Sequence, residues 1–316
     1  MLLLYYKIPY KQRIILRHFY YRITNFGFKY KPEEGLNMLK IKIILYFFFH
    51  PKLKKEYNNE IKFLKNYSNK NFSYSYVFPY DFISNYSYKR ILVFRDEEKG
   101  LFYVFHKEKR LYFKKSIETV TEVQIAYFCI LIEQDKQSPH RYLDNDFDID
   151  QNSVVIDVGA AEGILGLDNI DKISKLYIFE ANPEWVDALN ATFEPWKDKV
   201  TIVNKYVSNN IINDNITLDA YFNVNHIDFI KIDVEGAEMM IFEGAKKILN
   251  KDSLKIVVCT YHRQNDAKKI EEVLVENNFR CTFTDKFMLF ILVELNPPYF
   301  RKGLIRSQKQ NIDLVG

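Results

Sequence analysis

The sequence predicts an α/β fold, in which a smaller α+β region precedes a mostly parallel, Rossmann-like sheet. Short apolar runs that are typical of buried parallel strands recur after residue 150, and helical patterns separate them. Three of these runs end in an acid, at Asp157, Glu180 and Asp233. In doubly wound sheets ligands bind at the carboxyl ends of the strands, near the point where the strand order reverses. We therefore expect the three acids to converge at one edge.

The segment VVIDVGAAEG, residues 154–163, predicts the first strand and a turn that can hold a small charged ligand. Gly159 allows a ligand to approach the backbone, and the next helix offers its free N–H groups to a carboxylate. Asp157 can face the positive part of the same ligand. Ala161 replaces the second glycine of the dinucleotide fingerprint, and an ordinary glycine turn without a ligand fits the pattern equally well.

The helix after this turn should be short. Residues 164–175 contain two aspartates and Gly166, and a glycine inside a helix costs ~1 kcal/mol relative to alanine.

The segment KLYIFEANPEW, residues 175–185, predicts a second strand that ends in Glu180. Glu180 follows Asp157 by 23 positions, close to the offset at which a strand-end acid accepts hydrogen bonds from ribose hydroxyls. Asn182 can cap the next helix, with Pro183 at its first position. The alternative for Glu180 is a solvent-facing strand end.

Two further strands complete the pattern. Residues 227–249 predict a strand that ends in Asp233 and then one amphipathic helix, whose apolar residues are Met239, Met240, Phe242, Ala245, Ile248 and Leu249. Residues 256–259 predict another strand, with His262 at its end, either as a functional group or as a structural histidine. Buried carboxylates need a cation or hydrogen-bond donors, which a cationic, diol-bearing ligand supplies.

At this point the motifs DVGAAEG, YIFEANPE, TLDAYF (217–222) and IDFIKIDVEGAE, with His262, resemble the FkbM family of S-adenosylmethionine-dependent methyltransferases. The resemblance covers about residues 125–300, and segments 133–143 and 297–307 resemble one branch of the family. It implies the class I methyltransferase fold, whose last strand is antiparallel, and methylation of a hydroxyl of a sugar, glycan or lipid-linked sugar. S-adenosylmethionine, with its carboxylate, ammonium and sulfonium, fits the ligand that the first turn predicts.

These inferences define three predicted sets of site residues. The cofactor site contains Asp157, Gly159, Ala160, Glu162, Glu180, Ala181, Asn182 and Ser208. Asp233 and His262 are the candidate bases for the hydroxyl proton, with Glu235 third, and Asp233 has the alternative role of holding the cofactor's ammonium. The resemblance adds Ser138, His140 and Arg141 as substrate-binding residues near Asp233. We assign no metal ligands, although Asp233 with Glu235 is a weakly supported alternative site for a divalent ion.

Two other functions fit the same fold. One is an RNA ribose 2′-O-methyltransferase, in which a lysine near the fourth-strand acid, here Lys231, takes part. The sequence contains no recognisable RNA-binding module, so we expect no nucleic-acid partner. The other is a scaffold that has lost catalysis.

Residues 1–120 form a predicted basic, aromatic extension, and residues 121–316 the predicted methyltransferase domain. Residues 1–116 carry 24 Lys and Arg against 9 Asp and Glu, whereas residues 117–316 carry 21 against 32. Residues 5–23 can form a basic, aromatic helix that contacts an anionic membrane surface or glycan, that binds nucleic acid by the same electrostatics, or that docks on the catalytic domain. Residues 53–67 have helical spacing, residues 90–115 predict three short strands with a hairpin across 106–109, and a helix is expected near 118–134.

The remaining features favour a cytoplasmic protein, with peripheral contact to the inner membrane surface as a further expectation. The three cysteines lie far apart in the sequence, which predicts neither a disulfide framework nor a zinc site. The opening MLLLYY lacks the basic region of a signal peptide, and the apolar run 40–49 is too short to span a bilayer.

Overall fold

The computed structural model describes residues 32–66, 77–222, 226–291 and 295–310. The chain divides into two compact units, Met1–Phe72 and Ser73–Gly316, which we describe separately. The prediction for residues 5–23 lies outside the described residues.

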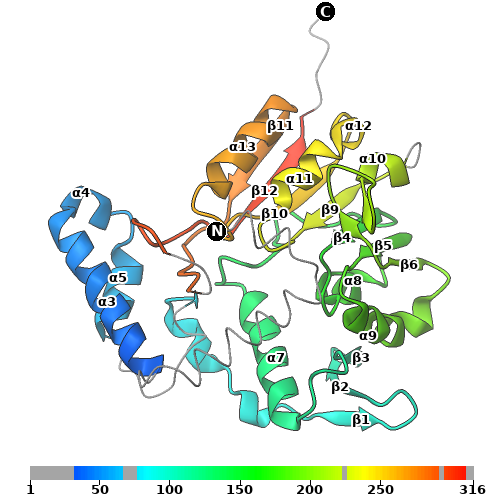
Figure 1. The fold of residues 1–316 in the computed structure, drawn as a ribbon, viewed down its shortest axis with the longest axis horizontal. Coiled ribbons are helices and arrows are strands. Elements are labelled where there is room, and N and C mark those ends of the chain that lie inside the picture. The colour runs from blue at the N-terminus through cyan, green and yellow to red at the C-terminus, as the bar shows by residue number, and fades with distance from the viewer. Residues whose placement is uncertain (1–31, 67–76, 223–225, 292–294, 311–316) are drawn as a thin grey trace, which may run out of the picture. The chain divides into compact units, whose positions relative to one another are not determined.

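The second unit is built on a seven-stranded sheet with the order β11-β12-β10-β9-β4-β5-β6 (Figure 1). The strand β12 runs antiparallel to both of its neighbours, β10 and β11, and all the other neighbouring pairs in the sheet are parallel. This confirms the predicted fold class and its final antiparallel strand. The strands are β4 (Val154–Val158), β5 (Lys175–Phe179), β6 (Val200–Val203), β9 (Phe229–Ile232), β10 (Lys255–Cys259), β11 (Phe279–Phe283) and β12 (Leu304–Lys309).

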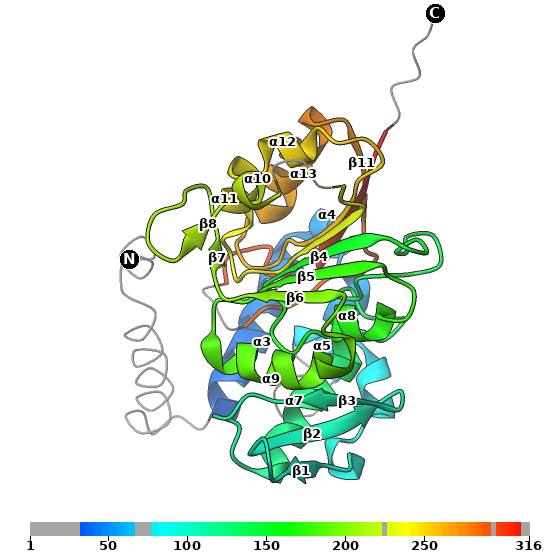
Figure 2. The same cartoon turned by 90° about the vertical axis from the view of Figure 1, so that its right-hand side faces the viewer.

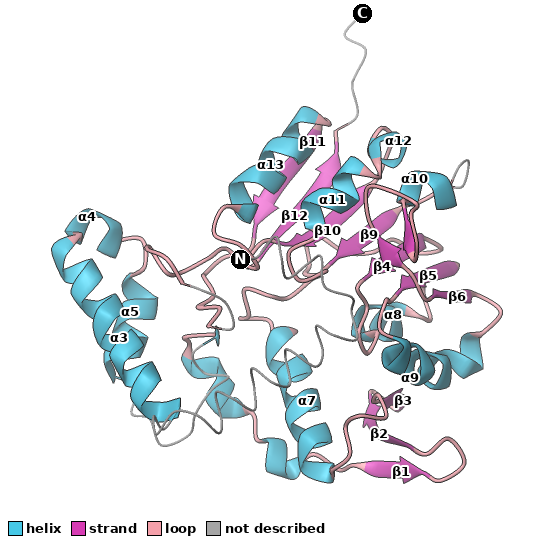
Figure 3. Ribbon diagram, viewed as in Figure 1, coloured by secondary structure: helices cyan, strands magenta, loops and turns pink. Residues whose placement is uncertain are grey.

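Helices cover both faces of this sheet (Figures 2 and 3). Successive strand residues point to opposite faces, so Val155 packs in one hydrophobic cluster and Ile156 in the other. The first cluster includes residues of α7 (Val120–Glu133), α8 (Ile164–Asn169) and α9 (Pro183–Phe193). The second includes residues of α10 (Leu218–Tyr221), α11 (Glu238–Glu243), α12 (Lys246–Leu249) and α13 (Asp266–Glu276).

Two glycines of this unit lie in close contact with neighbouring residues. The helix α8 has six residues, as predicted, and a Cβ on its Gly166 would lie 2.6 Å from a methyl group of Leu176. The prediction of one continuous helix up to residue 249 is wrong, because the structure has two helices there, α11 and α12, separated around Gly244. A Cβ on Gly244 would lie 2.2 Å from the carbonyl oxygen of Ser208, so close backbone packing sets the break. Met240 is exposed, contrary to its predicted place on the apolar face.

The part of the extension that belongs to the second unit contains the predicted hairpin. Its strands are β1 (Phe94–Asp96), β2 (Leu101–His106) and β3 (Lys109–Tyr112), paired antiparallel in a separate sheet. This sheet packs on α9, where the backbone N–H of Tyr112 donates to Oγ1 of Thr192 at 3.0 Å. The short elements are η1 (Asp81–Asn85), η2 (Tyr88–Arg90), η3 (Glu194–Trp196), β7 (Tyr206–Val207) and β8 (Asn215–Ile216). The predicted domain boundary at residue 120 stays a prediction.

The first unit contains three described helices, α3 (Pro32–Phe49), α4 (Pro51–Lys54) and α5 (Asn58–Asn66). The helical spacing in residues 53–67 is divided between α4 and α5, because the chain turns at residues 55–57. Tyr57, Ile61 and Leu64 are buried as that spacing predicts, whereas Leu53 is exposed. None of the helices that the structure describes is long and apolar enough to cross a bilayer.

Candidate functional site

The loops that follow β4 and β9 meet where the strand order reverses. The chain builds β5 and β6 on one side of β4, and β10 and β12 on the far side of β9. Gly159 has a φ of +73°, and a Cβ there would lie 2.0 Å from the carbonyl oxygen of Asp233. Gly159 therefore serves the close contact of two backbone segments, in addition to any ligand that approaches it.

Lys231 lies between the carboxylate of Asp157 and this turn. Its Nζ is 3.0 Å from Oδ1 of Asp157 and donates to the carbonyl oxygen of Gly159 at 2.7 Å. Burial would lower the pKa of the Lys231 ammonium, but the carboxylates of Asp157 and Asp233 outweigh it and raise that pKa. Asp157 thus faces a cation that belongs to the chain itself.

Glu180 is held at the end of β5 by two backbone donors. Its Oε1 accepts from the N–H of Asn182 at 2.7 Å, and its Oε2 accepts from the N–H of Ala161 at 2.9 Å. Ala161 has a φ of +50°, the left-handed conformation that its place in the glycine turn requires. A carboxylate has about four acceptor sites, so each oxygen of Glu180 keeps capacity for a further donor. We call Asp157, Gly159, Ala161 and Glu180 the β4–β5 end.

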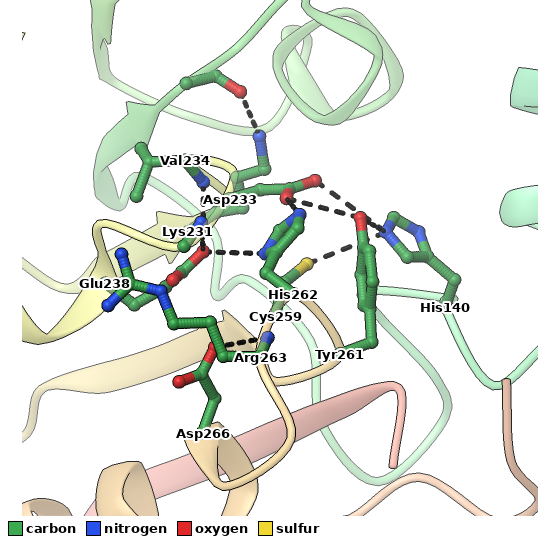
Figure 4. A network of polar contacts seen from close by, with 12 residues as sticks. His140, Lys231, Asp233, Val234, Glu238, Cys259, Tyr261, His262, Arg263 and Asp266 are labelled. Atoms are coloured by element: carbon green, nitrogen blue, oxygen red, sulfur yellow. Dashed lines mark hydrogen bonds and ion pairs between the residues drawn. The ribbon is translucent and has the colours of Figure 1, made fainter. Parts of the chain in front are cut away.

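Asp233 is the centre of a second group of side chains, the Asp233 cluster, which contains Asp233, His140, Tyr142, Tyr261 and His262. Figure 4 shows His140, Tyr261 and His262 around Asp233. Tyr142 donates to Oδ2 of Asp233 at 2.9 Å, and Tyr261 donates to Oδ1 at 3.5 Å. Nε2 of His140 lies 3.7 Å from Oδ2, and Nε2 of His262 lies 3.5 Å from Oδ1. The structure therefore brings together the strand acid, the strand-end histidine and a residue of the 138–141 segment.

The Asp233 cluster separates the protonation states of its members. Burial alone would raise the pKa of Asp233, but Lys231 and the two histidines lower it to about 2. Burial lowers the pKa of His140 to about 4, which leaves this imidazole neutral at pH 7. Burial opposes the charge of His262 as well, but Glu238 and Asp233 raise its pKa above the ordinary histidine value.

Glu238 supports His262 from behind. Its Oε1 lies 2.8 Å from Nδ1 of His262 and accepts from the N–H groups of Val234 and Gly236 at 3.3 and 3.2 Å. The Glu238 side chain is buried, and it fixes which ring nitrogen of His262 faces Asp233. Glu238 and Asp233 face different nitrogens of the His262 ring, and these three residues offer possible ligand atoms within 4.8 Å of one another. The arrangement is suited to sharing a proton.

The other predicted site residues occupy varied places. Glu235 is exposed, with a φ of +55°, and lies on the solvent side of the turn after β9. Ser138 is buried, and its Oγ accepts from the N–H of His140 at 3.1 Å. Nε of Arg141 donates to the carbonyl oxygen of Leu143 at 2.6 Å. Ser208 is buried and donates to the side chain of Asn209.

Four predicted residues flank the β4–β5 end. Asn182 caps α9 by accepting from the N–H of Glu184 at 3.1 Å, as predicted. Ala160 is buried, Ala181 is partly buried, and the side chain of Glu162 is also partly buried. Burial and the carboxylates of Asp157 and Asp233 raise the pKa of Glu162 to about 7, against the smaller opposing effect of Lys231.

The sequence alone did not identify four residues of this region: Glu133, Tyr142, Glu238 and Tyr261. Burial, Glu162 and Asp233 raise the pKa of Glu133 to about 8. Tyr142 and Tyr261 lie two residues or fewer from His140 and His262, so polar aromatics beside predicted site histidines were the available indication. Glu238 resembles an ordinary acid in the first turn of a helix, and only the fold shows that it is buried.

Part of the chain is similar to known methyltransferases. The family model described as the Methyltransferase FkbM domain matches residues 187–281, which include Asp233 and His262. No curated protein matches the sequence. The crystal structure of an FkbM methyltransferase from Methylobacillus flagellatus shares 16% identity and a TM-score of 0.42, over 61% of this chain and 54% of that chain. This chain thus spans about half the length of that protein.

Other solved structures show similar values. An rRNA methylase from Streptococcus thermophilus shares 17% identity and a TM-score of 0.37, over 52% of this chain and 90% of that chain. A precorrin-6y methyltransferase from Geobacter metallireducens shares 13% identity and a TM-score of 0.38, over 52% and 83%. The family match over residues 187–281 confirms the predicted resemblance to the FkbM methyltransferases, and the sheet order is that of the predicted class I methyltransferase fold.

Proposed function

We propose that the protein is an S-adenosylmethionine-dependent O-methyltransferase that acts on a hydroxyl of a sugar or glycan. The observation that carries the proposal is the Asp233 cluster, an ionised carboxylate surrounded by two histidines and two tyrosines beside the β4–β5 end. Hydrogen-bonding side chains of this kind suit a polyhydroxylated acceptor.

The residues at the β4–β5 end fit the chemical groups of the methyl donor. The remaining acceptor capacity of Glu180 suits the two ribose hydroxyls. Glu133 and Glu162 have pKa values raised by burial to about 8 and about 7, so a cation bound between them would favour their ionised forms. The donor's ammonium and sulfonium are such cations. Lys231 already neutralises Asp157, so we assign Asp157 to holding the turn after β4.

The chain's own contribution to the reaction is alignment and proton transfer. Bound S-adenosylmethionine supplies a methyl group that its sulfonium already activates, so the protein has to orient the acceptor oxygen and exclude water. The acceptor hydroxyl donates to Asp233, which lies ready in its ionised form. Nδ1 of His140 is buried without a hydrogen-bond partner among the described residues, and an acceptor hydroxyl would satisfy it.

The environment of Lys231 distinguishes this proposal from the RNA alternative. An RNA 2′-O-methyltransferase of the kind expected from the sequence needs a lysine that acts on the acceptor. Here Nζ of Lys231 lies between Asp157 and the carbonyl oxygen of Gly159. That position favours a structural role for Lys231 and leaves the proton to the Asp233 cluster.

The donor side is tested by calorimetric titration of the full chain with S-adenosylmethionine. In Glu180→Gln one oxygen still accepts, but the amide NH2 faces one of the two backbone N–H groups and cannot accept from the ribose, so we expect affinity to fall about 10- to 100-fold. The control is Glu276→Gln, at an exposed acid on α13. If the native protein does not bind S-adenosylmethionine, the scaffold alternative is favoured instead.

The acceptor side is tested with methyl-labelled S-adenosylmethionine and two sets of acceptors, mono- and oligosaccharides in one and an RNA oligonucleotide with its 2′-deoxy counterpart in the other. We expect label in the saccharides, and Asp233→Asn should lower the rate about 100-fold while donor binding changes little. Label that enters RNA and not its deoxy form would overturn the glycan proposal in favour of the RNA alternative.

A further inference from the structure

The helix α3 is apolar on two sides. Ile43 and Phe47 are buried, and the Phe47 ring packs on Tyr57, which precedes α5, with a centroid distance of 5.4 Å. On another side, Ile41, Leu45 and Phe48 are exposed by 57%, 52% and 73%. A helix that only had to pack in its own unit would carry polar residues on this second side.

The exposed apolar residues of this region are Ile41, Leu45, Phe48 and Phe49 on α3 and Leu53 on α4, and we call them the α3 stripe. The positions 41, 45, 48 and 49 follow the i, i+4, i+7, i+8 spacing that places side chains on one side of a helix. The Phe48 and Phe49 rings contact each other edge to face, with centroids 5.2 Å apart. Phe49 is 71% exposed, so the stripe ends in two large rings that face solvent.

The charge near the α3 stripe is mainly positive, and the exposed Glu56 is the next acid along the chain. Residues 39–55 contain five lysines and no Asp or Glu. Lys42 lies next to the stripe on α3, while Lys52 and Lys55 follow it beyond the end of the helix, and all three are exposed. A partner of this surface must therefore accept large apolar side chains and offer negative charge at the same place.

We propose that the α3 stripe binds the surface of an anionic lipid bilayer. Phe48 and Phe49 enter the boundary between headgroups and acyl chains, and the neighbouring lysines lie at the level of the anionic headgroups. A bilayer surface supplies both requirements, because apolar burial and attraction to anionic lipids add for a helix that lies in the interface. In this proposal the helix lies in the interface and does not cross the bilayer. The proposal is independent of the methyltransferase chemistry.

The apolar part is tested by sedimentation of the full chain with vesicles of phosphatidylcholine alone or mixed with phosphatidylglycerol. We expect binding to the mixed vesicles, and at least about tenfold weaker binding of Phe48→Gln/Phe49→Gln. Gln is a good helix former, so α3 should persist, which far-ultraviolet circular dichroism checks. The control is Val275→Gln, which removes an exposed apolar residue on α13 and should leave vesicle binding unchanged.

The electrostatic part is tested by Lys52→Glu/Lys55→Glu, with Lys136→Glu/Lys197→Glu as the control pair of exposed lysines in the second unit. We expect the first pair to abolish the preference for anionic vesicles and the control pair to keep most of it. Three results would overturn the proposal: no sedimentation of the native chain with anionic vesicles, undiminished binding of the Phe double variant, or equal losses for both lysine pairs. Light scattering that shows a native dimer which the Phe variant makes monomeric, without vesicle binding, would assign the stripe to a second copy of the chain.

Discussion

The β4–β5 end and the Asp233 cluster lie side by side but are held in different ways. At the β4–β5 end, backbone N–H groups bind Glu180, and one buried lysine binds both Asp157 and the turn. In the Asp233 cluster, side chains from residues 140–142 and 261–262 surround one carboxylate. A site built on backbone groups is a property of a local motif, whereas one built on distant side chains can change its chemistry without changing the fold.

Lys231 gives the largest expected effect, because it supports both regions. Lys231→Met leaves the buried carboxylate of Asp157 without its cation, and removing one partner of a buried pair costs about 3–5 kcal/mol. We expect a loss of this size in the free energy of unfolding, measured by urea denaturation at pH 7.

The matched control is Lys255→Met. Nζ of Lys255 lies 2.8 Å from a carboxylate oxygen of Asp150, but the Asp150 side chain is 74% exposed. An ion pair of this kind contributes about 0–1 kcal/mol. Equal losses for the two variants would contradict our description of the Asp157–Lys231 pair as the buried support of both regions.

The contrast between local backbone contacts and distant side-chain contacts also explains which parts of the site the sequence could predict. Buried parallel strands are apolar along their length and end in turns, so β4, β5, β9 and their terminal acids were apparent from pattern alone. Glu180 and the cap at Asn182 follow from local spacing. Lys231 interrupts an apolar strand, and its partner Asp157 lies 74 positions earlier, on a neighbouring strand. Pairings of that kind depend on strand order.

The Asp233 cluster was predicted only in part for the same reason. His140 and Tyr142 lie in an irregular segment after α7, where no periodicity indicates which side chains face the sheet. The family resemblance suggested His140, and nothing local suggested Tyr142 or Glu238. The helix break at Gly244 was missed because its cause is the backbone of Ser208, far away in the sequence.

The second largest effect concerns pH and distinguishes the Asp233 cluster from the β4–β5 end. Burial lowers the pKa of His140 to about 4, whereas in an unfolded chain it lies near 6.5. Below pH ~6.5 the unfolded chain binds a proton that the native chain does not bind. The contribution of neutral His140 to stability is therefore complete above this pH and is lost as the pH falls toward 4, by about 2–3 kcal/mol.

This prediction is measured as a difference between two proteins, because the raised pKa values of Glu133 and Glu162 act with the opposite sign in part of the same range. We expect His140→Gln to be less stable than the native chain at pH 7 and to lose less stability between pH 6.5 and 4. Parallel stability curves over this range would show that His140 is not the buried neutral group that we describe.

Gly159 lies between the β4–β5 end and the Asp233 cluster. Replacing it gives the smallest expected loss of stability of the three predictions, when measured against a matched control. In Gly159→Ala the new Cβ meets the carbonyl oxygen of Asp233 at 2.0 Å, on a backbone with a φ of +73°. Gly100→Ala has a similar φ of +66° but no atom within 4 Å of the new Cβ. The left-handed conformation costs roughly 1–2 kcal/mol in both variants, and overpacking adds about 1–3 kcal/mol only at Gly159.

Thermal unfolding should show a lower melting temperature for Gly159→Ala than for Gly100→Ala. Calorimetry should show weaker S-adenosylmethionine binding only for Gly159→Ala. Equal melting temperatures would mean that the turn after β4 can move away from Asp233, and that the two regions are less firmly joined than the native backbone indicates.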